Sequence, residues 1–525
     1  MAAPSSKRSS FLVASGILLS RIAGLVRDRV FAHYFGNSDA ADAFKAAFRI
    51  PNFLQNMFGE GVLSASFIPV YAGLRAGGDE AEARRTAAAV ASLLALTVSV
   101  LVLIGVLATP LLIDLIAPGF SGAKRELTIS LVRILFPGAG LLVGSAWCLG
   151  VLNSHHKFFL SYTAPIAWNA VMIATLLAWG GRREQFPLAL VLAWGSVAGS
   201  ALQALVQLPA VLKLLQGWRW SASYRTPSVR TVLYNFLPVF VGRGVVQISA
   251  YVDALIASLL PTGAVAGLSY AQTLYTLPVS LFGMSVSAAE LPAMSAELGV
   301  SADASATLRP RLDAGLRQIA YFVVPSAVAF MALGDVIVAA IYRTGRFQRE
   351  DVLYVWAILA AASIGLLTST LGRLYASTYY ALRDTRTPLR YAVLRVALTG
   401  ALGYVFAVHL PHWVGIPQRW GVVGLATSTS LAGWLEYALL RRSLNLRIGR
   451  TGLPPDFLFK LWAAAGAAAA VAGFLHHQLG SRHPAAEALL ILAPYGAIYF
   501  LATWLAKVPE AQTFLQLAGR SRFWP

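Results

Sequence analysis

The sequence is dominated by apolar stretches of about 17 to 25 residues, which alternate with short polar segments that contain Gly or Pro. A helix of about 20 apolar residues is long enough to cross the hydrocarbon core of a bilayer. We therefore predict an all-α polytopic membrane protein with about 14 transmembrane helices. The predicted spans lie near residues 11–34, 42–74, 88–117, 128–153, 162–180, 187–213, 229–257, 264–296, 314–341, 352–380, 389–410, 420–441, 457–478 and 486–506.

The composition excludes a soluble globular enzyme. Of the 525 residues, 57% are hydrophobic and only 12% are charged, whereas soluble proteins carry about 25% charged residues. The single cysteine, Cys148, excludes a disulfide framework or a multi-cysteine metal site, and we expect it to be a small core residue. No metal or cofactor is expected. The first apolar stretch contains Arg21 and Arg27, so we expect it to be retained rather than cleaved as a signal peptide.

The formal charge of +19 indicates membrane topology rather than nucleic-acid binding. The basic residues are scattered between apolar blocks and form no single basic domain, so the expected surroundings are a phospholipid bilayer and no nucleic acid. With the N-terminus in the cytoplasm, about 23 Lys and Arg fall on the cytoplasmic side and about 9 on the other. We therefore expect a multi-pass protein with both termini in the cytoplasm.

A weak internal repeat is typical of a transporter. A Phe-Gly pair between two prolines in 51–69 recurs in 278–292, roughly 225 residues later. Chance similarity between apolar helices is the alternative. The repeat predicts two six-helix lobes that alternate access to a central cavity, followed by two extra spans. The predicted boundaries are 1–220, 221–445 and 446–525.

Charged residues are concentrated in the first two spans, although an ion at the bilayer centre costs about 2.5 kcal/mol or more. These residues are Arg21, Arg27, Asp28, Arg29, Asp42, Lys45, Arg49 and Glu60. Those of the second span share one helical face. Mutual pairing is one explanation, but five cations face three acids, so positive charge is left over.

A cationic cavity fits an anionic ligand. Guanidinium groups bind phosphate through two parallel hydrogen bonds and are weakly hydrated, which suits a diphosphate in a low-dielectric cavity. Arg243 in the seventh span is a further intramembrane cation. It either contributes to such a site or is structural, by reaching the interface or pairing with Asp253.

Several motifs resemble the signature of the MurJ (MviN) lipid II flippases. Four of them lie in the first two spans, and two more follow the fourth and tenth spans. The matching segments are Ser20–Asp28, Asp42–Phe44, Arg49–Asn52, Phe58–Pro69, Leu152–Ser154 and Tyr380–Pro388. They run in order from the first span to the start of the eleventh.

The resemblance implies the fold of the MOP exporter superfamily and a bacterial inner-membrane location. It also implies lipid II as substrate, moved from the cytoplasmic to the periplasmic leaflet. The candidate substrate-binding residues are Arg21, Arg27, Asp28, Asp42, Arg49, Glu60 and Arg243. Two departures remove expected diphosphate contacts, because Gln55 and Thr273 stand where the family often has Arg. Arg243 is a candidate to supply one of them.

A second candidate site comprises Asp253 and Arg395. Some family members bind sodium between spans seven and eleven, and Asp253 fits that pattern. Thr399 and Gly403, however, stand where an Asn or Asp is expected. We predict that Asp253 pairs with Arg395 and that transport does not require sodium. Coupling to the membrane potential or to protons stays open.

Three other functions predict different residues in the spans. An intramembrane enzyme needs clustered carboxylates or a His-Glu-x-x-His motif, and the sequence has neither, so we expect no enzyme. A multidrug or cation antiporter of the same superfamily predicts an acidic cavity. A flippase for another polyprenyl-diphosphate-linked oligosaccharide shares the same anion, and only the family motifs argue against it.

Overall fold

The computed structural model describes residues 6–216, 226–298, 304–478 and 483–512. Within these ranges the chain forms helices joined by turns, and no strand is found. The predicted all-α fold is therefore confirmed. The glycine- and proline-containing segments between apolar runs become the turns, while the apolar runs become helices that satisfy their own backbone hydrogen bonds, as a bilayer requires.

Ten helical segments of the described chain are long and apolar enough to cross a membrane. The bent pair of α15 (Arg349–Ser363) and α16 (Leu366–Ala381), with 43° between its halves, adds an eleventh. Among the described residues, α1 (Ser6–Phe35), α10 (Pro227–Ser258) and α19 (Gly421–Ile448) are also 28 residues or longer. Together these segments are consistent with the predicted fourteen spans of a multi-pass membrane protein.

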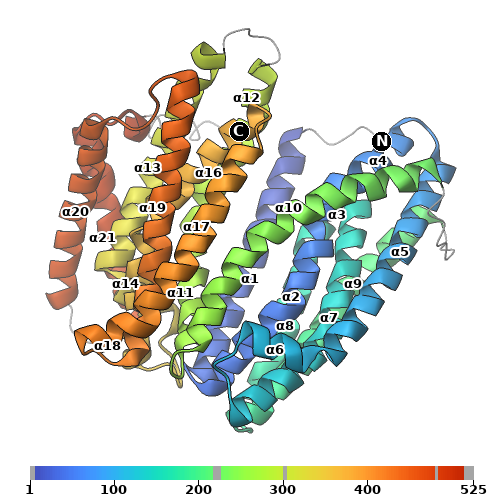
Figure 1. Ribbon diagram of the computed structural model, residues 1–525, viewed down its shortest axis with the longest axis horizontal. Coiled ribbons are helices and arrows are strands. Elements are labelled where there is room, and N and C mark those ends of the chain that lie inside the picture. The colour runs from blue at the N-terminus through green and yellow to red at the C-terminus, as the bar shows by residue number, and fades with distance from the viewer. Residues whose placement is uncertain (1–5, 217–225, 299–303, 479–482, 513–525) are drawn as a thin grey trace, which may run out of the picture. The chain divides into compact units, whose positions relative to one another are not determined.

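The helices fall into two compact units. The first unit includes the chain up to Ala266 and the short segment Thr344–Phe347. Within it, α7 is central and packs against α2, α5 and α9, while α1 packs against α8 (Figure 1). Besides α1 and α10, its helices are α2 (Asp39–Phe58), α3 (Glu60–Ser66), α4 (Ile68–Ala76), α5 (Glu80–Leu107), α6 (Thr109–Ile116), α7 (Gly122–Ser154), α8 (Phe158–Trp179) and α9 (Gln185–Leu215).

The second predicted span is broken at Gly59, between α2 and α3. The backbone of Gly59 is extended, with ψ of −156°. A Cβ at this position would collide with the carbonyl oxygen of Gln55. Glycine therefore fits the break between α2 and α3, where a larger residue would collide with the end of α2.

The second unit includes Gly267–Arg343 and the chain from Gln348 onward. Two π-helical segments, Val279–Met284 and Val405–His409, interrupt its spans. Besides α15, α16 and α19, its helices are α11 (Ala264–Pro278, which begins in the first unit), α12 (Ser285–Leu298), α13 (Ala304–Ala332), α14 (Gly334–Tyr342), α17 (Arg386–Tyr404), α18 (Leu410–Val414), α20 (Pro455–Gln478) and α21 (Pro484–Leu505).

Helices α20 and α21 pack against α13 and α14. Figure 1 shows α20 and α21 side by side, and α20 packs on α13 while α21 packs on α14. Pro325 in α13 has no N–H, so the carbonyl of Tyr321, four residues earlier, loses its helical partner. The hydroxyl of Tyr499 donates to that carbonyl at 2.6 Å, and the hydroxyl of Tyr495 donates to the Pro325 carbonyl at 2.7 Å. Two tyrosine side chains of α21 thus supply hydrogen bonds to the α13 carbonyls at and before Pro325.

The compact units differ from the predicted lobes at one helix. The prediction assigned residues 221–445 to the second lobe, whereas α10 packs against α2 and α3 in the first unit. How the lobes divide during transport stays a prediction.

Candidate substrate-binding cavity

The first unit contains a polar cavity of about 880 Å³, lined by α1, α2, α3, α7, α8 and α9. Its polar wall includes Arg27, Asn52, Gln55, Asn56, Asn169 and Gln203. Polar groups inside a membrane protein are costly unless they are paired or face water. Their concentration around one cavity indicates a hydrated binding site for a polar ligand.

Arg27 is the cation that lines this cavity, and α8 holds its side chain. One guanidinium nitrogen donates to Oδ1 of Asn169 at 3.2 Å, and another donates to Asp28 at 3.1 Å. The guanidinium carbon lies 4.8 Å from the ring centre of Trp168. Asn169 is itself fixed, because its Nδ2 donates to the carbonyl of Pro165 at 3.0 Å. The planar guanidinium is thus stacked and oriented before any ligand arrives.

Asp28 lies behind Arg27 and is shared by two cations. Its side chain contacts Lys45 of α2 at 3.3 Å through the same oxygen, Oδ1, that accepts from Arg27. Asp28 is buried, with 6% of its surface exposed. One carboxylate therefore contacts two positive side chains, and the predicted cationic character of the cavity stays a prediction.

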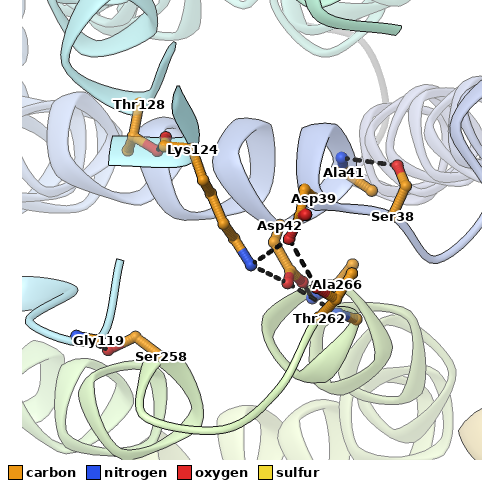
Figure 2. Close-up of polar contacts among 11 residues, drawn as sticks. Ser38, Asp39, Ala41, Asp42, Gly119, Lys124, Thr128, Ser258, Thr262 and Ala266 are labelled. Atoms are coloured by element: carbon orange, nitrogen blue, oxygen red, sulfur yellow. Dashed lines mark hydrogen bonds and ion pairs between the residues drawn. The ribbon is translucent and has the colours of Figure 1, made fainter. Parts of the chain in front are cut away.

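Asp42, a predicted substrate-binding residue, contacts side-chain and backbone groups of two other segments of the first unit (Figure 2). Its carboxylate pairs with Lys124 of α7 at 2.6 Å. It also accepts hydrogen bonds from the backbone N–H groups of Gly263 at 2.8 Å and Ala266 at 2.7 Å, where α11 begins. Asp42 is 1% exposed and is not part of the cavity wall. A buried carboxylate with these partners is satisfied by the protein itself.

Two other predicted site residues, Arg21 and Arg49, do not line the cavity. Arg21 is exposed on α1, outside the cavity wall, and no hydrogen bond or ion pair reaches it within the described part of the chain. Arg49 of α2 is influenced by the charge of Asp253. The side chains of Glu60 and Arg243 lie outside the described residues.

The two departures from the family pattern occupy different surroundings. Gln55 lines the cavity, so an uncharged amide stands in its wall. Thr273 Oγ1 donates to the carbonyl of Ser269 within α11 at 3.0 Å, which is an ordinary helical side-chain bond.

The structure gives Asp253 and Arg395 different neighbours from those predicted. Nε of Arg395 lies 3.3 Å from Oε2 of Glu436, in the second unit. Asp253 lies in the first unit near Arg49. The pair of Asp253 with Arg395 stays a prediction, and within the second unit Arg395 pairs with Glu436, which the sequence analysis did not name.

Sequence reasoning also missed the α8 side of the cavity. Trp168 and Asn169 lie in an apolar predicted span. The polar Asn169 within that span was a sequence feature that could have indicated this side of the site. On the opposite wall, the amides of Gln203 and Gln207 both donate to the hydroxyl of Ser145, at 3.0 and 2.6 Å. Within the described ranges, no group of three His, Cys, Asp or Glu residues is placed to hold a metal ion.

Two solved structures of transporters have a similar fold. A structure described as lipid II flippase MurJ in an inward closed conformation matches with a TM-score of 0.75 and 24% identity, covering 94% of this chain and 98% of that one. An inward-facing multidrug-resistance MATE transporter of the MOP superfamily matches with a TM-score of 0.65 and 15% identity, over 83% of this chain and 98% of that one. The chain therefore has the fold that these two proteins share.

Sequence comparison narrows this fold to one family. The family model described as lipid II flippase MurJ matches residues 31–507. A Vibrio cholerae protein named probable lipid II flippase MurJ is 32% identical over 456 residues, which are 84% of this chain and 83% of that protein. The lipid II flippase MurJ of Burkholderia cenocepacia is 30% identical over 514 residues, 95% and 97% of the two chains. The chain belongs to the MurJ lipid II flippase family.

Proposed function

We propose that this protein is a lipid II flippase of the bacterial inner membrane. It carries the lipid-linked peptidoglycan precursor from the cytoplasmic to the periplasmic leaflet by alternating access. The diphosphate binds in the cavity of the first unit, where Arg27 supplies the charged contact. The observation that carries this proposal is the pairing of Arg27 and Lys45 with the single carboxylate of Asp28 beside a polar cavity.

The chemistry of the cavity supports an anionic, sugar-bearing ligand. A guanidinium that already has one carboxylate contact still offers other N–H donors to phosphate oxygens. The amides of Asn52, Gln55 and Asn56 line the same cavity and suit the hydroxyl and amide groups of a glycan. A cation antiporter needs the opposite sign of charge, so the surplus of cations argues against it.

The proposed orientation follows the distribution of Lys and Arg, with both termini in the cytoplasm. In this orientation the substrate headgroup enters from the cytoplasmic side and leaves on the periplasmic side. We further propose that two lobes move relative to each other about the bound substrate, a mechanism that the internal repeat favours.

Two measurements test the function. Depletion of the protein in its native host is expected to accumulate lipid II in the cytoplasmic leaflet, with loss of cell-wall synthesis. The purified protein in liposomes is expected to move a labelled lipid II between leaflets. Accumulation of a different polyprenyl-diphosphate-linked oligosaccharide, with normal lipid II turnover, would show that the substrate is not the peptidoglycan precursor.

A further inference from the structure

The second unit holds a cluster of charged side chains that the proposed cavity does not include. Arg373 lies on α16, Arg395 on α17 and Glu436 on α19. Arg395 and Glu436 form an ion pair of 3.3 Å. The charges of all three residues act on one another, and both arginines act on the hydroxyl of Tyr275 of α11. Two guanidinium groups therefore lie near one carboxylate, and only that of Arg395 forms an ion pair with it.

A hydrogen bond between helices places Arg373 in this cluster. The hydroxyl of Tyr275 lies 2.8 Å from that of Ser369 on α16. Ser369 and Arg373 are four residues apart, so their side chains lie on the same face of α16, one turn from each other. The face of α16 that meets Tyr275 is thus also the face that carries Arg373.

The cluster lies deep within the spanning helices. At 1.5 Å per residue, Arg373 is about 12 Å along α16 from its end at Ala381. Arg395 is about 13 Å from the start of α17 at Arg386. Both distances approach half of a hydrocarbon core of about 30 Å. A charge at that depth needs a partner or water.

Arg373 has no such partner among the residues that the structure describes. Its side chain is exposed, and no hydrogen bond or ion pair reaches it within the ranges that the structure describes. Glu436 is already engaged by Arg395. The cluster thus keeps a net positive charge and presents an accessible guanidinium.

We propose that Arg373 and Arg395 form a second anion-binding site, located in the second unit, for the phosphate group of a lipid. The guanidinium N–H groups of Arg373 are free to donate to the phosphate, and Glu436 competes with the ligand for Arg395. The ligand is either a polyprenyl diphosphate or a bilayer phospholipid, which share the phosphate chemistry. The site goes beyond the proposed function, because it does not require the ligand to be lipid II.

The test measures binding to the full-length protein in nanodiscs of zwitterionic lipid, in an Arg27→Gln background that weakens the first-unit cavity. The probes are inorganic pyrophosphate, a short-chain polyprenyl diphosphate and phosphatidylglycerol. Arg373→Gln is expected to weaken binding of at least one probe by about tenfold or more. Glu436→Gln is expected to strengthen it, because the change releases Arg395. Arg390→Gln, on an exposed position of α17, is the matched control and is expected to change nothing.

The three probes identify the ligand. If Arg373→Gln weakens binding of the polyprenyl diphosphate alone, the ligand is the substrate lipid. If it weakens binding of phosphatidylglycerol, the ligand is a bilayer phospholipid. Unchanged binding of all three probes in folded Arg373→Gln protein overturns the site. So does a Glu436→Gln variant that unfolds at lower temperature and binds no better, since the cluster is then structural. If Arg373→Gln does not fold, Arg373→Lys replaces it, because it keeps the charge and loses the planar fork. Equal binding by Arg373→Lys and the background protein then counts against the site. Lipid II flipping by the wild-type chain tests the proposed function separately.

Discussion

Asp42 and Lys124 form an ion pair of 2.6 Å between α2 and α7, and the same carboxylate caps the start of α11. Three segments that are far apart in the sequence thus meet at one buried side chain. The sign of the charge at Asp42 suits this role, because the N-terminal N–H groups of a helix carry partial positive charge.

Replacement of Asp42 by Asn is expected to destabilise the fold. The variant leaves Lys124 without its buried partner and presents an amide NH₂ to backbone donors, a loss of about 3–5 kcal/mol. Thermal unfolding in detergent measures the change. Asp39→Asn is the control, because Asp39 also pairs with Lys124, at 2.9 Å, but its side chain is 45% exposed. If the Asp42→Asn protein is as stable as the wild type but no longer binds the diphosphate, Asp42 acts in substrate binding and not in stability.

Arg27→Ala and Arg21→Ala are both expected to abolish flipping while the protein still reaches the membrane. For Arg27 the reason is loss of a charge-assisted contact in the cavity, worth about 1.5–3 kcal/mol, or about 10- to 100-fold in affinity. Arg21 has no structural partner in the described chain, so its loss is expected to leave stability unchanged. Complementation of a depletion strain provides the readout. Normal growth with both variants would remove the proposed site.

Arg395→Leu alone is expected to harm activity or folding, because the half-buried Glu436 loses its ion-pair partner. Adding Glu436→Leu is expected to recover much of the stability, since removing both charges of a buried pair is often nearly neutral. Adding Asp253→Asn in place of Glu436→Leu is expected to give no recovery. The three variants are compared by thermal unfolding. Recovery with Asp253→Asn, and none with Glu436→Leu, would support the pair predicted from the sequence.

His155 is expected to make stability depend on pH. It follows α7 outside the spanning segments, and Nε2 lies 3.0 Å from the hydroxyl of Tyr71. Burial and the nearby charge of Arg75 lower the pKa of His155 to about 4, against about 6.5 when unfolded. Between these values the unfolded chain binds more protons. The contribution is therefore complete above about pH 6.5 and is lost as the pH falls toward 4.

His155→Gln is expected to flatten this part of the pH profile, measured as unfolding temperature at pH 7.5 and pH 4.5. His156→Gln, at the exposed neighbouring position, serves as control and is expected to keep the slope. An unchanged slope in His155→Gln protein would assign the pH dependence to another group.

The proposed topology can be checked with single cysteines, because the natural Cys148 is buried. Gln348→Cys lies at an exposed position of the predicted periplasmic connection, and Arg450→Cys at an exposed position of a predicted cytoplasmic one. An impermeant thiol reagent is expected to label the first in intact cells and the second only after permeabilisation. A reporter fused after Pro525 is expected to lie in the cytoplasm. The reverse labelling pattern would invert the orientation.

The sequence predicted the class of fold because the bilayer imposes a length and a polarity on every span. The sequence also predicts surplus positive charge in the first two spans, and the structure adds that Arg27 and Lys45 both contact Asp28 there. The predicted role of Asp42 in substrate binding stays a prediction, but its contacts could not be read from the sequence. Helical phase placed Asp42 on the same face as other polar residues, but phase cannot reveal that Lys124 and the start of α11 meet it there.

The same limit applies to Arg395. The sequence analysis named Asp253 as the partner of Arg395, and the structure places these two residues in different compact units. The partner found, Glu436, is 41 residues further along the chain, on a neighbouring helix of the same unit. Pairing between helices depends on their rotation and packing, which no single-span pattern encodes.

The hydroxyl bond from Tyr499 to Tyr321 has a consequence for how the chain is made. The two residues are 178 positions apart, so α13 is synthesised long before α21 emerges to satisfy the carbonyl that Pro325 leaves open. An unsatisfied carbonyl in hydrocarbon costs several kcal/mol. Assembly of the second unit therefore stays incomplete until Tyr499 has left the ribosome, and a chain cut short before α21 leaves that carbonyl without this partner.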